Sequence, residues 1–425
     1  MKKFITLLLL LPALKSYCSF EQYFSDGTLR IDYYFAGNDK ETHVFFDEMY
    51  KEPLWGGTKT LPKSKDNMGN FRYNLYSKET GLLLYSRGMS TLFHEWKTTT
   101  EAKEISRTMQ VSAIMPFPTS QVMFEIEERN MQTGKFNKIF SLYINPENYF
   151  ILPGIKQKCE WKKLIDNGDP ANLVDIAFIA EGYTASEKDK FYSDVARISN
   201  HILSQPPFNE HKNKFNVYAL AAVSEESGTD IPGRKIYKNT ALNSTFYTFN
   251  VDRYLATTDN KSIFDVAANV PYDAIIILVN SGEYGGGGFY NWYSLVTSDN
   301  SLSENIAVHE LGHSFAGLAD EYYTSEVAYN DFYNLKVEPW EENITTLVDF
   351  NSKWKDMVTS GTPTPTLRER QYRDVVGVFE GGGYAAKGIY SPMQDCMMNS
   401  GRGTFCPVCQ RTIEKMIDYL TEIEN

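Results

Sequence analysis

The spacing of apolar residues changes near residue 166, and this change most constrains the fold. Before it, short segments with a period of two, rich in aromatic and β-branched residues, are separated by turn signals; they are 30–35, 71–76, 81–86, 110–114, 121–126 and 139–144. Such segments predict an antiparallel β-sandwich. After it, apolar runs at 174–180, 215–221 and 274–279 alternate with helical patterns, one of which starts at a Thr184–Glu187 capping box. The second part therefore predicts an α/β (α+β) domain.

The first residues predict export. Met1, Lys2 and Lys3 carry positive charge, and the apolar run 4–14 that follows is too short to span a bilayer. We expect residues 1–18 to be a signal peptide, which places the protein in the periplasm, outside the cell or on its surface. Cys18 offers a lipid anchor as the alternative, although residues 15–17 do not form the usual small-residue lipobox.

Charge and hydropathy exclude two classes of protein. The formal net charge is −12, and no basic stripe offers itself to phosphates, so we expect no nucleic-acid partner. The longest apolar run after the N-terminus is 274–279, which predicts a buried strand rather than a transmembrane segment.

A helix that carries His309, Glu310 and His313 is the chemical centre of the sequence. Ser301 and Glu304 predict a capping box just before it. Residues four apart on a helix lie on one face, so the two imidazoles can bind one Zn²⁺ ion, and Glu310 beside them can act as general base. The flanking apolar residues predict that this helix is buried, where two histidines without a ligand would be costly.

A catalytic zinc needs a third protein ligand, and no histidine follows His313. In a continuous helix Asp320 would lie out of reach, about 10 Å further along the axis. Gly317 can end the helix in a left-handed conformation and turn the chain back. Asp320 is then the expected third ligand, and Glu321 is the alternative; the other acid would orient a ligand histidine.

Four cysteines follow the expected signal peptide. Cys406 and Cys409 form a CxxC pair, but a second such pair is missing, so the sequence does not predict a structural zinc site. A disulfide between Cys396 and one of these two is the simpler expectation.

The motif HExxHxxxGxxDEY, with the glycine-rich segment 379–390 and the segments 395–398 and 405–409, resembles the bacterial IgA-peptidase family of zinc metallopeptidases. The resemblance implies a metzincin-like catalytic domain. It further implies that the strand 292–297 is an edge strand that pairs with a peptide substrate, and that Met397, or else Met398, forms a Met-turn beneath the zinc. Tyr384 and Tyr390 are candidates for stabilising the oxyanion.

These expectations divide the chain into four parts. They are a signal peptide (1–18), an accessory β-sandwich domain (19–155), a linker (156–171) and the metzincin-like catalytic domain (172–425). The N-terminal part shows no catalytic set, since His94 and Glu95 lack a second histidine four residues on.

The expected function is that of an exported zinc metalloendopeptidase with one catalytic ion, in which Glu310 moves the proton from the attacking water to the leaving amine. The alternatives are a degenerate peptidase that binds glycan or protein, and a zinc hydrolase of a non-peptide amide. The substrate is expected to be a protein or glycoprotein, but the loops that set specificity and the oligomeric state are not predicted.

Overall fold

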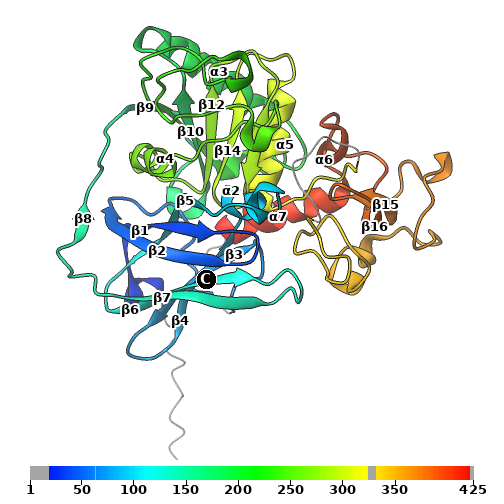
Figure 1. The fold of residues 1–425 in the computed structure, drawn as a ribbon, viewed down its shortest axis with the longest axis horizontal. Helices are drawn as coiled ribbons and strands as arrows, with labels where there is room; N and C mark the ends of the chain where they lie inside the picture. The colour runs from blue at the N-terminus through cyan, green and yellow to red at the C-terminus, as the bar shows by residue number, and fades with distance from the viewer. Residues whose placement is uncertain (1–18, 63, 324–331, 422–425) are drawn as a thin grey trace, which may run out of the picture.

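The computed structural model describes residues 19–62, 64–323 and 332–421, so the predicted signal peptide and Cys18 lie outside the described residues. The fold mixes α-helices with several β-sheets. Two four-stranded sheets form the N-terminal part, a six-stranded sheet with helices follows, and a hairpin and two helices complete the chain (Figure 1).

The N-terminal part is built mainly from strands. Its elements are α1 (Phe20–Tyr23), β1 (Phe24–Gly37), β2 (Thr42–Glu52), β3 (Phe71–Ser77), β4 (Leu83–Met89), α2 (Leu92–Lys97), β5 (Arg107–Pro118), β6 (Val122–Arg129), β7 (Phe136–Ile144) and β8 (Ile151–Pro153). The sheet orders are β5-β1-β2-β8 and β4-β3-β6-β7. Each period-two segment overlaps one of these strands. Strand β2 was not predicted from the sequence. In its pairing with β1, Asp32 faces Glu48 and Tyr33 faces Phe46, so β2 has one extra residue there that interrupts its period of two.

The central sheet follows. Its elements are β9 (Glu160–Ile165), β10 (Val174–Glu181), α3 (Lys188–Ile202), β11 (Phe215–Ala221), α4 (Asn260–Ala267), β12 (Ala274–Val279), β13 (Gly286–Phe289), β14 (Tyr293–Thr297) and α5 (Ser303–Ala316). The strand order is β13-β14-β12-β10-β11-β9. The four central strands are parallel, and β9 and β13 are the antiparallel edges.

This order corrects two expectations. The strand within 292–297 is not an edge, because β14 lies between β12 and β13, and β13 is the edge strand. The expected linker 156–171 contains β9, which pairs with β11. In both cases pairing with distant residues decided the structure, and local composition does not encode such pairing.

The two faces of the central sheet have different partners. Ile176 and Phe178 of β10 belong to the core shared with α3, α5 and α7 (Pro407–Thr421). Ala177 and Ile179, on the opposite face, belong to the core that includes α4 and the N-terminal sheets. The N-terminal part therefore completes the hydrophobic core on one side of the central sheet.

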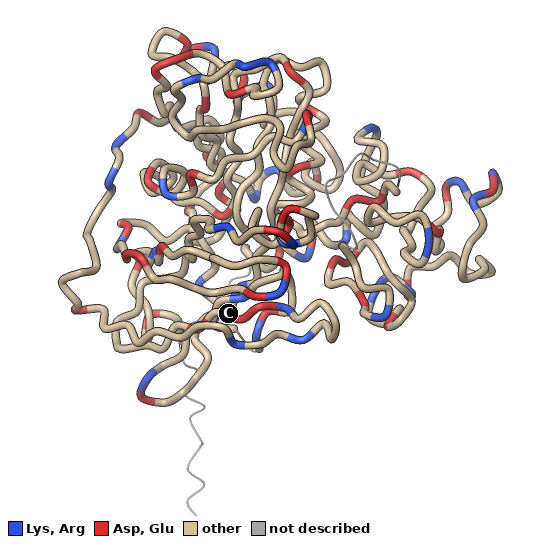
Figure 2. Tube along the Cα trace, viewed as in Figure 1, with Lys and Arg blue, Asp and Glu red and all other residues tan. Residues whose placement is uncertain are grey.

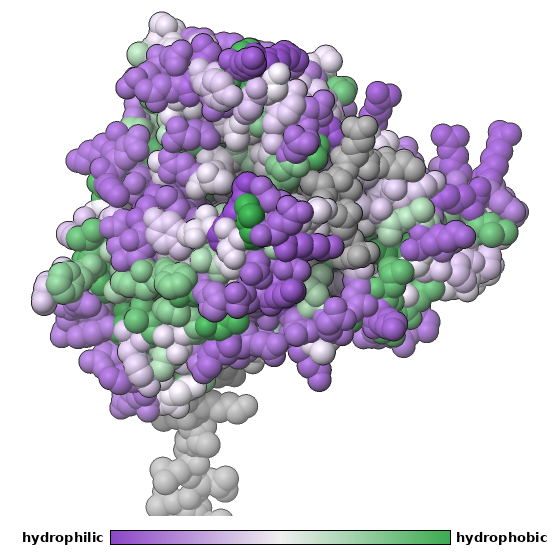
Figure 3. All heavy atoms as spheres, viewed as in Figure 1, coloured by the Kyte–Doolittle hydropathy of each residue, from purple (hydrophilic) through white to green (hydrophobic). Residues whose placement is uncertain are grey.

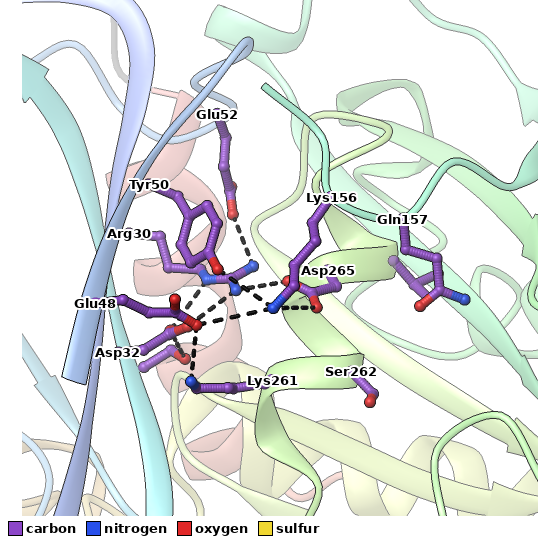
Figure 4. A network of polar contacts seen from close by, with 12 residues as sticks. Arg30, Asp32, Glu48, Tyr50, Glu52, Lys156, Gln157, Lys261, Ser262 and Asp265 are labelled. Carbon is purple, nitrogen blue, oxygen red and sulfur yellow. Dashed lines mark hydrogen bonds and ion pairs between the residues drawn. The ribbon is translucent and has the colours of Figure 1, made fainter. Parts of the chain in front are cut away.

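A buried ion network joins the same two parts (Figure 4). Arg30 of β1 is 1% exposed and contacts Asp32 at 2.9 Å, Glu52 at 3.3 Å and, on α4, Asp265 at 2.6 Å. The Arg30 guanidinium also lies 4.3 Å from the centre of the Tyr50 ring. One cation thus holds carboxylates from both sides of the interface.

The C-terminal segment beyond α5 forms the lobe on the right of Figure 1, with β15 (Phe379–Gly382), β16 (Ala385–Ser391) and α6 (Met397–Ser400). From this lobe α7 returns to pack against α5 and β10.

Basic and acidic residues are interspersed along the chain in this view (Figure 2). Apolar side chains gather over the N-terminal sheets on the face in Figure 3, and the exposed aromatic residues of this part include Phe45, Phe46 and Phe150. Within the described residues, no helix is both long and apolar enough to cross a membrane.

Candidate active site

Helix α5 carries the two predicted imidazoles. The helix is buried on the side of Ala307, Val308 and Leu311, which fixes the direction in which its polar residues face. The expected Ser301–Glu304 capping box is wrong: Leu302 is the N-cap, its N–H donates to Asn300 Oδ1 at 3.0 Å, and Glu304 pairs with Arg197 instead.

The end of the helix is as predicted. Gly317 has a φ of 64°, and the next backbone N–H, that of Leu318, donates to the Gly312 carbonyl at 3.1 Å. This left-handed cap reverses the chain. As a result Asp320 comes back to the histidines: its Oδ1 lies 3.1 Å from His309 Nε2 and 3.4 Å from His313 Nε2.

Backbone carbonyls orient both imidazoles. His309 Nδ1 lies 3.0 Å from the Met397 carbonyl oxygen, and His313 Nδ1 lies 2.6 Å from that of Leu318. Because a carbonyl only accepts, each ring must carry a proton on Nδ1, which leaves Nε2 as the atom that each ring can offer to a metal. The two Nε2 atoms are 3.1 Å apart.

This arrangement fits a metal ion. Asp320 Oδ1 is buried and accepts no hydrogen bond within the described part of the chain, so three lone-pair atoms face one another. In a tetrahedral zinc site with bonds of about 2.0–2.1 Å, neighbouring nitrogen and oxygen ligands lie about 3.3 Å apart. The three distances here are close to that value. His309, His313 and Asp320 could therefore hold one metal ion.

Protons compete with a metal ion for the nitrogen and oxygen atoms of this site. Burial opposes a charge on His313, but the Asp320 carboxylate outweighs it and raises the pKa of His313 to about 9. Burial likewise opposes ionisation of Asp320, yet the two rings hold its pKa well below the usual range. Without a metal, the carboxylate keeps an imidazole protonated, as expected for a site built around positive charge.

Glu310 lies against the edge strand. A Cβ atom added to Gly286 would lie 2.7 Å from Glu310 Oε1, and one added to Gly288 would lie 3.1 Å from Glu310 Oε2. The glycines of β13 thus make room for this carboxylate. Burial raises the pKa of Glu310, although both histidines oppose the shift.

Glu321, the alternative third ligand, faces away from the histidines. It is 0% exposed, its Oε1 accepts a hydrogen bond from Asn343 Nδ2 at 3.0 Å, and the same atom lies 3.2 Å from Cys409 Sγ. Asp320 and Glu321 are adjacent in a segment that is neither helix nor strand, and their carboxylates contact different groups.

Of the two candidate tyrosines, only Tyr384 lies at the site. The Tyr384 hydroxyl donates to Asp320 Oδ2 at 2.5 Å and lies at the site. Tyr390 is on β16, where its backbone pairs with Thr345, and it does not line the cavity.

Both methionines of the expected Met-turn are fully buried. Met397 contributes its carbonyl to His309, while the Met398 sulfur approaches so closely that a Cβ on Gly312 would lie 2.8 Å from it. The turn therefore supports α5 through both residues.

A cavity of about 350 Å³ opens over the histidines. Several residues that line the cavity were not predicted from the sequence, because they lie outside any motif. They include Arg253 and, from the N-terminal part, Asn70, Ser90 and Glu95. Tyr322, the last residue of the HExxHxxxGxxDEY motif, lines the cavity as well. His94, next to Glu95, is buried away from it, and burial lowers its pKa to about 3.

The expected disulfide is wrong. Cys159, Cys396, Cys406 and Cys409 are all free thiols, and Cys396 Sγ and Cys409 Sγ are 3.8 Å apart.

Two family models match the chain. The model described as IgA Peptidase M64 matches residues 163–372 and 364–417, and the model described as Peptidase M64 N-terminus matches residues 19–141. A comparison with curated proteins finds no match. Since the first model spans more than half of the chain, and its match includes the two histidines, Glu310 and Asp320, the chain is a peptidase and belongs to the IgA peptidase M64 family.

Proposed function

We propose that this peptidase is a zinc-dependent endopeptidase whose one catalytic ion is held by His309, His313 and Asp320. The observation that carries the proposal is the set of three lone-pair atoms 3.1–3.4 Å apart, with both imidazoles fixed through Nδ1. When bound, zinc polarises the scissile carbonyl and lowers the pKa of a water molecule.

Glu310 is the proposed general base. It follows a ligand histidine on α5 and lies beneath β13, so its carboxylate is close to both the site and the edge of the sheet. It takes the proton of the attacking water and passes it to the leaving amine. Tyr384, which bonds Asp320 Oδ2, is a positioning residue and the remaining candidate for stabilising the oxyanion.

Strand β13 is the proposed substrate strand. The Gly286 carbonyl accepts a hydrogen bond from Leu255 N–H at 3.4 Å, on the side away from β14. Since backbone groups alternate sides along a strand, Gly288 also faces that side. We assign to its N–H and C=O the binding of an extended peptide, which explains how a protein chain would lie across Glu310.

The arrangement supports a metzincin-like catalytic domain: a zinc helix, a glycine turn, a third ligand after it and a methionine turn below. It also supports a β-sandwich for the N-terminal part, whose two sheets contribute to one core. The boundaries 19–155 and 172–425 stay predictions, and the shared core makes the N-terminal part integral to the enzyme.

Export stays part of the proposal. It depends on the charge and hydropathy of residues 1–18, and N-terminal sequencing of the mature protein checks it. A mature protein that begins at Cys18 with a bound lipid would support the anchor instead.

The function is tested with Glu310→Gln, which keeps the size of the side chain and removes the base. We expect proteolysis of a peptide library to fall at least about 1000-fold, with the metal still bound. Glu304→Gln is the matched control, because Glu304 lies on the same helix and pairs with Arg197 outside the site.

Two outcomes contradict the proposal. Undiminished proteolysis by Glu310→Gln would contradict the assignment of Glu310 as the general base. A wild-type enzyme that is active without metal would contradict the dependence on zinc. A metal-bound wild-type protein that cleaves no peptide but binds glycan or protein would favour the binding module, and cleavage of a non-peptide amide alone would favour the other hydrolase.

A further inference from the structure

A second group of potential ligands lies beside the first one. Cys396, Cys406, Cys409 and Glu321 are each at most 4% exposed, and their sulfur and carboxylate atoms lie within 4.8 Å of one another. They come from three places in the chain: the turn after Asp320, the residue before α6 and the start of α7. The catalytic proposal uses none of them.

We propose that these four residues form a second, structural metal site that takes Zn²⁺ through three thiolates and one carboxylate. Zinc accepts four such ligands in a closed tetrahedral site, and thiolates are its preferred structural ligands. The site stands independently of the catalytic zinc, because no ligand is shared.

The sulfur geometry favours a metal over a disulfide. Cys396 Sγ and Cys409 Sγ are 3.8 Å apart. Two sulfurs bound to one tetrahedral zinc with bonds of about 2.3 Å lie about 3.8 Å apart, whereas a disulfide joins them at about 2.0 Å. The Cys406 backbone N–H also points to Cys396 Sγ at 3.2 Å, which is the contact that a thiolate ligand accepts.

The carboxylate supplies the second, independent observation. Glu321 Oε2 is buried and has no hydrogen-bond partner in the ranges 19–62, 64–323 and 332–421. No Lys, Arg or His of those ranges forms an ion pair with Glu321 at 4.0 Å or less. A buried carboxylate without a cation is strongly unfavourable, and a disulfide between two of the cysteines would not relieve it. A divalent cation bound to Oε2 and to the sulfurs would compensate the buried charge.

The site would also act on the catalytic centre through the backbone. Glu321 follows Asp320, and its N–H donates to the Met398 carbonyl at 2.7 Å. Cys396 precedes Met397, whose carbonyl holds His309. A metal bound to Glu321 and Cys396 would therefore link the turn that carries Asp320 to the Met-turn, and so fix the positions of Asp320 and His309 relative to each other.

The test measures the metal itself in a protein without the first site. In the His309→Ala/His313→Ala double variant we expect one zinc per chain by elemental analysis, against two in the wild type. After exchange with Co²⁺, this variant should show thiolate-to-cobalt charge-transfer absorption, which a site of two imidazoles and one carboxylate cannot produce.

Variants of the second site complete the test. Cys406→Ser should abolish the charge-transfer band or reduce its intensity by about a third, since one of three thiolates is lost. Cys159→Ser is the matched control, because Cys159 lies outside the cluster, and it should leave the band unchanged. Glu321→Gln keeps all three sulfurs, and we expect it to retain the band and to weaken metal binding at least about tenfold.

The outcomes separate this inference from the proposed function. No metal and no band in the double variant overturns the second site, whether or not the wild type is a zinc peptidase. Alkylation of the thiols without reductant gives a second check. If the mass shows two alkyl groups fewer than the number of cysteines, two of them form a disulfide, and the second metal site is overturned as well. Failure of the catalytic proposal leaves the double variant with its single zinc and its band.

Discussion

The Tyr384 hydroxyl donates a hydrogen bond to Asp320 Oδ2 at 2.5 Å, while Asp320 Oδ1 faces His309 Nε2 at 3.1 Å. The tyrosine thus holds the carboxylate by one oxygen and leaves the other for a metal. Groups that orient a ligand in this way strengthen the site without touching the ion.

Tyr384→Phe should therefore weaken metal binding and lower kcat/KM, each by about 10- to 100-fold, because the carboxylate is free to rotate. Competition with a chelator measures the first quantity and peptide hydrolysis the second. Tyr390→Phe is the control: this residue lies on β16 away from the cavity and should change neither. Equal effects of both variants would contradict the role of Tyr384.

Gly288→Ala should disturb the catalytic helix. The new Cβ would lie 2.6 Å from the Glu310 carbonyl oxygen and 3.0 Å from His313 Cβ, so β13 must move away from α5. We expect kcat/KM to fall at least about tenfold with a fold that remains intact by circular dichroism. Gly282→Ala, in the loop before β13, meets nothing within 4 Å and should retain full activity. Full activity of Gly288→Ala would show that the helix does not need this close approach.

Arg30→Met should destabilise the whole protein, because it leaves Asp32 and Glu52 buried without the guanidinium and Asp265 with only Lys156, at 3.7 Å. The expected loss in the free energy of unfolding is about 3–5 kcal/mol. Arg107→Met tests an exposed ion pair, with Glu101, and should cost less than about 1 kcal/mol. Urea unfolding measures the loss in the free energy of unfolding of both variants. A loss for Arg30→Met no larger than that for Arg107→Met would contradict a stabilising role of the buried network.

The same network predicts a dependence of stability on pH. Burial raises the pKa of Glu52 from 4.5 to about 7, although Arg30 opposes the shift. Between these two values the folded protein holds a proton that the unfolded chain has lost. The contribution of Glu52 to stability is therefore fully present below pH 4.5 and is lost as the pH rises through about 7, at up to about 1.4 kcal/mol per pH unit.

Glu52→Gln removes this titration. We expect the melting temperature of the variant to fall less steeply than that of the wild type between about pH 5 and about pH 8. Parallel curves for the two proteins would mean that Glu52 titrates alike in the folded and unfolded states.

The sequence predicted well where structure is local. His309 and His313 share a face because a helix repeats every 3.6 residues, and Gly317 ends the helix because glycine enters the left-handed region at little cost. Period-two segments likewise marked β1, β3, β4, β5, β6 and β7.

Tertiary structure decided what depends on residues far apart in the chain. Asp320 and Glu321 are chemically alike, and only the position of the histidines and the cysteines around the turn determines which carboxylate faces which group. In the same way, strand pairing placed β14 inside the sheet and β13 at its edge, and packing brought three cysteines together without a disulfide.

The sequence by itself thus determined that His309, Glu310 and His313 share one helix and that this helix ends at Gly317, because backbone periodicity and a single glycine act within a few residues. Only the tertiary structure showed that Asp320 rather than Glu321 faces the histidines, that β13 is the edge strand and that the N-terminal part shares the core. These relationships follow from packing between segments that lie far apart in the chain, and no local pattern records such packing.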